Sequence, residues 1–513
     1  MILLLILAVP LVAGAMSLAV NRRAAMEKIN LSAFALVLAL AGILVARVLR
    51  DGSVSVWSGF LAADSLSALV VLLTAVVALA CSVYAIGYFR DDERDHIAAN
   101  VRKYYALTPL FVFAMLMVAV ANNLGVMWVA TEATTLTSVF LIAFYGRATS
   151  LEAAWKYTMI GGVGLSMALF GTILTYYAAR NVPGADTLAG LSWSVLAKNA
   201  PQLDNTTMKF AFILILLGYG TKAGIAPMHT WKPDAYSEAP VPAAAMLAAG
   251  VLNCALYALI RFHVLAVRSI GPQFGSQLLI FFGLLSIGVA VPFVLVQKSF
   301  RRILAYSSID QGGIMILGLG FGGPFGALGM LLHMTFHSVT KPLLFFCVGN
   351  VQQRLKTDLF QQAKGGLIDS MPVAGSILLM AMLAVTSTPP FSMFQSEFTI
   401  LRAGFTGGHI VPAALCVGFL AAIFAGFLVH FSGLVLGAGP EADRSASGAT
   451  ESAQAEGSVV RVEQNESAQE TPCPWKTSSL IGLASIVVIL AFWLPRPLFE
   501  LIRNAARIAS GEP

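Results

Sequence analysis

The chain has 513 residues, of which 58% are apolar and 11% are charged, with 32 Lys or Arg against 26 Asp or Glu. A soluble protein of this length would form about three domains with polar surfaces, and about a quarter of its residues would be charged. The composition therefore excludes a soluble enzyme, a disordered chain and a disulfide-rich secreted scaffold. It favours an all-α polytopic membrane protein, in which the net charge of +6 reflects basic loops rather than nucleic-acid binding.

Long apolar runs predict the number of helices. A membrane-spanning helix needs about 20 mostly apolar residues. About fourteen such runs occur, at roughly 1–20, 29–49, 64–88, 104–121, 124–145, 154–178, 208–227, 242–262, 276–297, 302–321, 325–350, 371–401, 409–437 and 478–497. The first run lacks the basic start of a signal peptide, and similar runs follow it, so we expect it to be an uncleaved helix.

Basic residues in the connections predict the orientation. With the N-terminus outside, 18 Lys and Arg fall in cytoplasmic connections, Lys232 among them, and 11 fall in outer ones, Arg261 among them. Cytoplasmic loops carry an excess of Lys and Arg, so we expect both termini on the outer side of a bacterial or archaeal inner membrane. Three bases remain inside apolar runs: Lys156, Lys222 and Lys341.

Two of the interior charges lie in the first half of the chain, before the predicted helix break. A charge at the centre of a membrane helix costs about 2.5–3.5 kcal/mol on insertion scales, so it persists where it pairs or lines a hydrated path. Glu132, in WVATEATTLTS, is either a hydrogen-bonded packing residue or part of such a path. Lys156, in LEAAWKY, either extends to the membrane interface or acts beside Glu132.

Lys222 and Glu397 each lie beside a predicted interruption of a helix. Lys222 is in LLGYGTKAGIAPMHTW, and Glu397 is in VTSTPPFSMFQSEF. Gly and Pro inside a span mark a broken helix whose free backbone groups face a cavity. Two broken spans that each carry an ionisable residue indicate inverted repeats with sites near the middle of the membrane.

His333, His337 and Lys341, in LHMTFHSVTK, are spaced one turn apart on one helical face. Histidine changes charge near neutral pH, so this face suits proton transfer. Two histidines at this spacing could also form half of a zinc site, but no third ligand is near and the lysine opposes a cation. Asp310, in AYSSIDQGG, is either a structural acid or a further relay group.

We predict no cofactor and no metal for this chain. Its five cysteines form no close pair, and the sequence has no iron–sulfur, haem c or zinc motif. Electron carriers, if the protein serves a redox system, are therefore expected in other subunits.

The C-terminal region has a different composition. Residues 438–477 are rich in Ser, Ala, Glu, Gln and Gly, which predicts a flexible cytoplasmic loop, either a tolerated insertion or a docking segment. The tail LFELIRNAARIASGEP predicts a short amphipathic helix at the membrane interface.

Five stretches, in this order, resemble the proton-translocating antiporter-like subunits of respiratory complex I, membrane-bound hydrogenases, formate hydrogenlyases and Mrp-type Na⁺/H⁺ antiporters. They are WVATEATTLTSVFL, GYGTKAGIAPMHTWKPDAYSEAPVP, RRILAYSSIDQGG, HMTFHSVTKPLLFF and PPFSMFQSEF, within residues 60–435. LEAAWKY and HSVTKPLLFFCVGN most resemble the hydrogenase-4 component F branch of the family.

The resemblance implies fourteen helices with two inverted five-helix repeats and interrupted helices 7 and 12. It divides the chain into N-terminal helices (1–103), the repeats (104–262 and 276–437), the loop (438–477) and a final helix with its tail (478–513). It also implies residue roles: a charged pair in the first half-channel, a central lysine fed by two histidines, and an exit residue. These are Glu132 with Lys222, Lys341 with His333 and His337, and Glu397.

The sequence departs from the family pattern near the second motif. Helix 8 often carries a lysine or histidine that links the half-channels, but the corresponding positions here are Leu247 and Asn253, so water would have to bridge the gap. In HTWKPDAYSEAP, Lys232 and Tyr236 replace the common Leu and His.

The resemblance implies a proton-translocating subunit that couples redox chemistry in partner subunits to proton pumping. The partners would be other membrane-arm subunits and a peripheral hydrogenase-like or quinone-linked module, so the chain would belong to an oxidoreductase complex without holding a redox centre. The alternatives are a Na⁺/H⁺ antiporter subunit and an inorganic-carbon uptake subunit, neither tied to electron transfer. Buried charges disfavour a pure scaffold.

Overall fold

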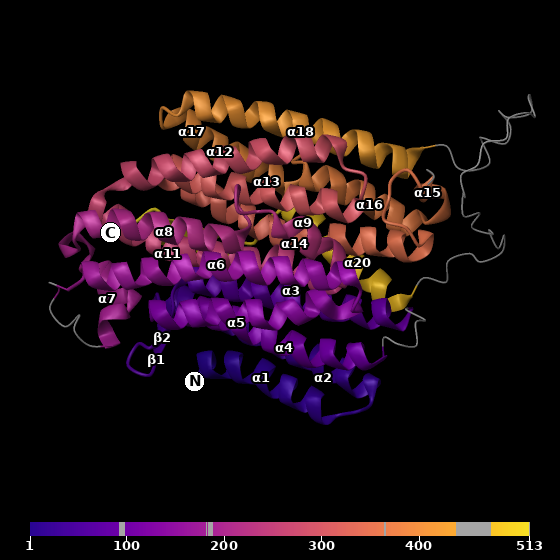
Figure 1. The fold of residues 1–513 in the computed structure, drawn as a ribbon, viewed down its shortest axis with the longest axis horizontal. Coiled ribbons are helices and arrows are strands. Elements are labelled where there is room, and N and C mark those ends of the chain that lie inside the picture. Colours follow the sequence, from indigo (N-terminus) through magenta and orange to yellow (C-terminus); the bar gives the residue numbers. More distant parts are fainter. Residues whose placement is uncertain (92–97, 181, 183–187, 364–365, 438–472, 512–513) are drawn as a thin grey trace, which may run out of the picture.

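The computed structural model describes all residues except 92–97, 181, 183–187, 364–365, 438–472 and 512–513. Long helices run side by side along the long axis of the molecule (Figure 1). A short antiparallel hairpin joins β1 (Val54–Val56) to β2 (Leu61–Ala63), with Val54 opposite Ala63. Apart from this hairpin, the predicted all-helical class is confirmed.

Twelve helices in the described ranges are long and apolar enough to cross a membrane, which confirms a polytopic membrane protein. They are α1 (Ile2–Ala19), α2 (Arg23–Asp51), α3 (Ser65–Arg90), α4 (Ala98–Val120), α5 (Leu124–Ile142), α6 (Ala148–Ala178), α10 (Val241–Met246) continuing into α11 (Leu252–Ile270), α12 (Pro272–Val296), α13 (Phe300–Phe321), α14 (Gly323–Leu355), α18 (Ile410–Leu436) and α20 (Pro474–Phe492). The remaining α-helices are α7 (Trp193–Lys198), α8 (Asn205–Ala223), α9 (Trp231–Glu238), α15 (Leu367–Ser370), α16 (Pro372–Val385), α17 (Ser392–Thr406) and α21 (Arg496–Ala509).

Helix breaks occur at the two places where the sequence predicts interruptions. The chain leaves the helix between α8 and α9, and again between α16 and α17. Gly224 caps α8 with φ +70°, a left-handed conformation that glycine adopts without a side-chain penalty. An ionisable residue lies close to each break: Lys222 in the last turn of α8, and Glu397 near the start of α17.

The centre of the molecule is formed by the helix 241–270 together with α13 and α14. The apolar windows of these three helices are completely buried, whereas less than half of the windows of α6, α12 and α18 is buried. A helix enclosed on all sides must satisfy its polar groups from neighbouring helices, because no solvent reaches them. Polar residues on these three helices are therefore the first candidates for a functional site.

The C-terminal tail forms a helix, as the sequence predicts. This helix, α21, packs its apolar face against α3 and α14. Leu501 and Ile502 are completely buried there. The predicted loop 438–477 lies almost wholly outside the described residues, which resume at 473 just before α20.

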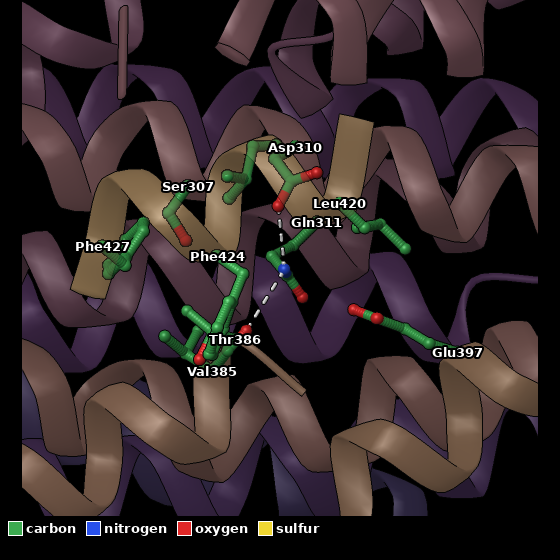
Figure 2. A pocket seen from close by; sticks show the side chains of 10 residues that line it. Ser307, Asp310, Gln311, Val385, Thr386, Glu397, Leu420, Phe424 and Phe427 are labelled. Carbon is green, nitrogen blue, oxygen red and sulfur yellow. Dashed lines mark hydrogen bonds between the residues drawn. The ribbon is translucent and has the colours of Figure 1, made fainter. Parts of the chain in front are cut away.

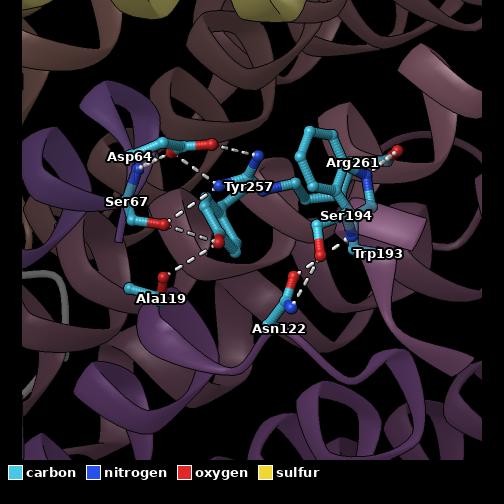
Figure 3. A network of polar contacts seen from close by, with 8 residues as sticks. All are labelled: Asp64, Ser67, Ala119, Asn122, Trp193, Ser194, Tyr257 and Arg261. Atoms are coloured by element: carbon cyan, nitrogen blue, oxygen red, sulfur yellow. Dashed lines mark hydrogen bonds and ion pairs between the residues drawn. The ribbon is translucent and has the colours of Figure 1, made fainter. Parts of the chain in front are cut away.

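A network of polar contacts joins α3 to α11 (Figure 3). Arg261, on α11, donates to both carboxylate oxygens of Asp64 at 2.7 Å and to the Ser67 hydroxyl at 2.9 Å. The Tyr257 hydroxyl lies 3.0 Å from Ser67 Oγ and donates to the Ala119 carbonyl. Burial alone would raise the pKa of Asp64, but the Arg261 guanidinium and the Ser67 amide hold that pKa below its ordinary value of 3.8. Arg261 is therefore a buried, paired base and not the loop residue that the sequence predicts.

Candidate functional site

Lys222 is the centre of a first buried cluster. It lies in the last turn of α8, where the partial negative charge of the helix end favours a cation. Its Nζ donates to Thr135 Oγ1 at 2.8 Å and to the Tyr157 hydroxyl at 2.7 Å, and Tyr157 lies 2.8 Å from Ser138 Oγ. These four side chains come from α5, α6 and α8 and are all buried. They connect a lysine to a row of hydroxyl groups.

Glu132 lies on α5, almost one turn before Thr135. Its Oε2 is buried and has no hydrogen-bond partner among the described residues. In the same part of the chain no ion pair within 4.0 Å joins it to Lys222, whose Nζ contacts the hydroxyl groups instead. Glu132 and Lys222, the charged pair implied by the resemblance, thus form no ion pair in this structure.

Lys156 is not an interior charge. Its side chain is 44% exposed, and Nζ contacts Glu152 at 2.7 Å and Asp234 at 3.0 Å. Asp234 also accepts from Arg302 at 2.5 Å. Of the two alternatives that the sequence leaves for Lys156, the structure favours the interfacial one, because the amine is held by surface carboxylates.

The second buried cluster is centred on His333. Its Nδ1 lies 3.0 Å from Ser396 Oγ on α17, and its Nε2 lies 2.6 Å from Gln311 Oε1 on α13. The Gln311 amide nitrogen donates to Asp310 Oδ2 at 3.0 Å, so its oxygen is the atom that accepts from His333. Asp310 is thereby connected to the interrupted helix through an amide and an imidazole.

Glu397 follows Ser396 in α17 and faces the same region. Together with Asp310 and Gln311 it lines a small cavity, to which α18 contributes Phe424 and Phe427. Figure 2 shows the Asp310 and Glu397 carboxyl groups pointing into this space beside the Gln311 amide. The cavity holds about 20 Å³, and one water needs about 10–15 Å³. It is therefore large enough for a water molecule between the two acids.

His337 and Lys341 continue the face of α14 that begins at His333. All three side chains are completely buried, and one helix carries them, as the spacing predicts. Within the described ranges, neither His337 nitrogen nor Lys341 Nζ has a hydrogen-bond partner. Buried polar atoms in native proteins nearly always pair with protein or ordered water, so these atoms, on one face of a central helix, are candidate sites for bound water and proton transfer.

Lys232 is a buried base that the sequence pattern assigns to a cytoplasmic loop. It lies in α9, it is only 1% exposed, and its Nζ donates to the Ser308 carbonyl of α13 at 3.3 Å. The prediction fails because Pro and Gly around the break resemble a loop, whereas the chain returns to the interior as a helix. The sequence signal that could have identified it is the replacement of the common Leu in the motif.

We define the central polar axis as the buried ionisable residues of α8, α9, α13, α14 and α17. Only its Lys, His, Asp and Glu members are counted, because Arg and Tyr do not exchange protons near neutral pH: Lys222, Lys232, Asp310, His333, His337, Lys341 and Glu397. In the described part of the chain, no group of three or more His, Cys, Asp or Glu side chains is arranged to bind a metal ion. The axis is thus a set of proton-binding groups on five helices.

A family model described as "NADH:quinone oxidoreductase/Mrp antiporter, TM" matches residues 121–424, which is more than half of the chain. The chain belongs to this family. A protein named hydrogenase-4 component F homolog, from Methylacidiphilum infernorum, is 37% identical over 368 residues, which cover 71% of this chain and 77% of the relative. The predicted family is therefore confirmed.

Two solved structures share the fold of this antiporter-like subunit. A chain of the membrane-bound sulfane sulfur reductase, an archaeal respiratory membrane complex, is 23% identical, with a TM-score of 0.83 over 99% of this chain and 97% of that chain. A chain of the Mrp complex from Dietzia sp. is 20% identical, with a TM-score of 0.81 over 99% and 96%. At these identities the likeness concerns the fold.

Proposed function

We propose that this antiporter-like subunit translocates protons and couples them to redox chemistry in partner subunits. The observation that carries the proposal is the central polar axis, above all Lys341 and His337, which are completely buried and have no hydrogen-bond partner among the described residues. Desolvating an unpaired charge is costly, so small movements of neighbouring charges are enough to change whether such a group holds its proton. Proton transfer needs this property.

The architecture supports transfer across the membrane. We interpret α8 with α9, and α16 with α17, as two interrupted spans, which raises the count from twelve to the expected fourteen. Residues 104–262 and 276–437 would then form two inverted repeats, each with one broken helix and one ionisable residue beside the break. Both termini would lie on the outer side, which thiol labelling of single-cysteine variants at each end would test.

The absence of an ion pair between Glu132 and Lys222 in this structure suggests how the first cluster transfers protons. If Glu132 moves toward Lys222, the negative charge keeps the amine protonated. With Glu132 apart from it, Lys222 donates to the neutral hydroxyls of Thr135 and Tyr157, so it can pass its proton toward the second cluster. Glu397 would then release a proton on the outer side. Movements transmitted from the redox partners would set the position of Glu132.

The partner subunits are proposed from the relatives. One curated relative is named a hydrogenase-4 component F homolog, and one fold relative belongs to a respiratory membrane complex. We therefore expect other membrane-arm subunits and a peripheral hydrogenase-like or quinone-linked module to purify with this chain. Purification with Mrp-type partners only, or with a zinc-binding soluble partner only, would instead indicate a Na⁺/H⁺ antiporter or an inorganic-carbon uptake complex.

Proton translocation by the purified complex in proteoliposomes tests the proposal. Lys222→Ala should abolish translocation while the complex remains assembled, because the first cluster loses its proton-binding amine. Glu397→Gln should block release in the same assay. Normal translocation by the assembled Lys222→Ala complex would refute the proposed path, and normal translocation by Glu397→Gln would remove that residue from it.

A further inference from the structure

At Leu247 and Asn253, the two positions where the family often links the half-channels, the helix 241–270 has no side chain that carries protons. Asn253 lies there, completely buried, and its amide donates to Ser338 Oγ on α14 at 2.7 Å. Leu247 lies just before α11, in a π-helical turn at Leu247–Val251. Neither an amide nor a leucine takes up a proton near neutral pH. A proton path between Lys222 and Lys341 therefore needs water or a side chain from another helix.

Lys232 lies on α9, which contacts α6 of the first cluster and α13 of the second. On the first side, the Trp231 ring lies 4.9 Å from the Tyr157 ring, and its Nε1 donates to the Thr221 carbonyl, next to Lys222. The Lys232 stem lies against Gly224, where an added Cβ would come within 2.4 Å of Lys232 Cε. Glycine at position 224 thus leaves the space through which the lysine stem enters the interior.

On the second side, Lys232 reaches the other cluster. Its Nζ contacts the carbonyl of Ser308, two residues before Asp310. It also interacts electrostatically with His337 and with Lys341. The residue thus lies within range of the two buried groups of α14 that have no hydrogen-bond partner in the described part of the protein.

A structural role does not explain this lysine. An ammonium has three donors, but the acceptor that Lys232 Nζ contacts is a helix carbonyl at 3.3 Å, a long hydrogen bond. No carboxylate forms an ion pair with it within the described ranges, although Arg261 and Lys476, which are also buried bases, both have one. A leucine at this position would avoid the desolvation cost entirely.

We propose that Lys232 is the proton carrier that joins the first buried cluster to the second. This inference rests on the proposed function. Neutral Lys232 Nζ accepts a proton that Lys222 releases, and the resulting ammonium passes it on to the His337–Lys341 face. Only N–H bonds form and break, and the protein ends the step with the same number of protons.

The experiment compares Lys232→Gln, Lys232→Arg and Lys476→Gln in the complete complex, reconstituted in proteoliposomes. Gln keeps a donor for the Ser308 carbonyl but cannot carry a proton, and Arg keeps the charge but does not release it. Both Lys232 variants should lower the number of protons translocated per redox turnover at least about tenfold. Lys476→Gln removes a buried base outside the axis and should stay within about twofold of the wild type.

The outcomes separate this proposal from the proposed function. If either assembled Lys232 variant translocates normally while Lys222→Ala does not, Lys232 is not the carrier and the proposed function stands. If Lys222→Ala also translocates normally, the proposed function itself fails. Should Lys232→Gln not assemble, Lys232→Arg provides the same test with the buried charge retained.

Discussion

The Asp64–Arg261 network and the central polar axis are both buried, but their charges are arranged in opposite ways. Arg261 makes two hydrogen bonds to Asp64 and one to Ser67, so its charge is fully compensated. Lys341 is just as deeply buried and makes none within the described residues. The Asp64–Arg261 network holds α3 and α11 together. In the central polar axis, the Lys341 amine has no hydrogen-bond partner among the described residues.

This difference separates structural from functional charges. A buried pair costs desolvation energy that its mutual attraction repays only when both partners stay in place. An unpaired buried group gains no such compensation and contributes nothing to stability by being charged. We therefore expect substitutions in the Asp64–Arg261 network to affect folding and substitutions in the central polar axis to affect proton transfer.

The largest effect on stability is expected for Arg261→Ala. The variant leaves Asp64, whose side chain is only 20% exposed, without its cation, which should lower the free energy of unfolding by about 3 kcal/mol. The pKa of Asp64 is lowered in the folded wild type, so its contribution is complete above 3.8 and is lost as the pH falls below that value. Thermal unfolding in detergent, scanned from about pH 7 to about pH 3, measures both effects. Unchanged stability at neutral pH would contradict the structural role.

Lys341→Met should show the opposite behaviour. A methionine fills the same space without a charge, so the melting temperature should stay constant or rise. Proton translocation should fall at least about tenfold, because the second cluster loses its amine. A loss of stability as large as that of Arg261→Ala would show that Lys341 is structural, and the comparison between the two regions would fail.

Tyr157→Phe tests the first cluster with a smaller change. The hydroxyl bridges Lys222 and Ser138, so its removal should destabilise the protein by about 1–3 kcal/mol and lower translocation several-fold. Tyr84→Phe is the matched control, because the Tyr84 hydroxyl donates to Asn350 at 2.9 Å outside the axis. The control should lose similar stability but keep normal translocation. Equal translocation by the two variants would exclude Tyr157 from the path.

Lys156→Gln should have the smallest effect. The side chain is nearly half exposed and pairs with surface carboxylates, and such ion pairs contribute little. Translocation by the reconstituted complex should stay within about twofold of the wild type. A loss comparable to that of Lys341→Met would return Lys156 to the proton path that the sequence leaves open for it.

The sequence is sufficient to predict the class of protein, the family and both helix breaks. Long apolar runs are readable because the bilayer requires every backbone group to be satisfied within a helix. The breaks can be predicted because Gly or Pro residues coincide there with an ionisable residue inside an apolar run. The shared face of His333, His337 and Lys341 follows from helical periodicity. Each of these features is local in the chain.

The partners of each charge are decided only by the tertiary structure. From its neighbours in sequence, Lys156 is counted inside an apolar run and Lys232 in a loop, and the fold places the first at the surface and the second in the interior. Lys156 meets Asp234, which lies 78 residues away, and Lys232 meets Ser308, 76 residues away. Burial and pairing depend on which helices come together, and apolar runs do not encode this. The sequence therefore determines that a few charges lie in the membrane, and the fold decides which of them are free to act.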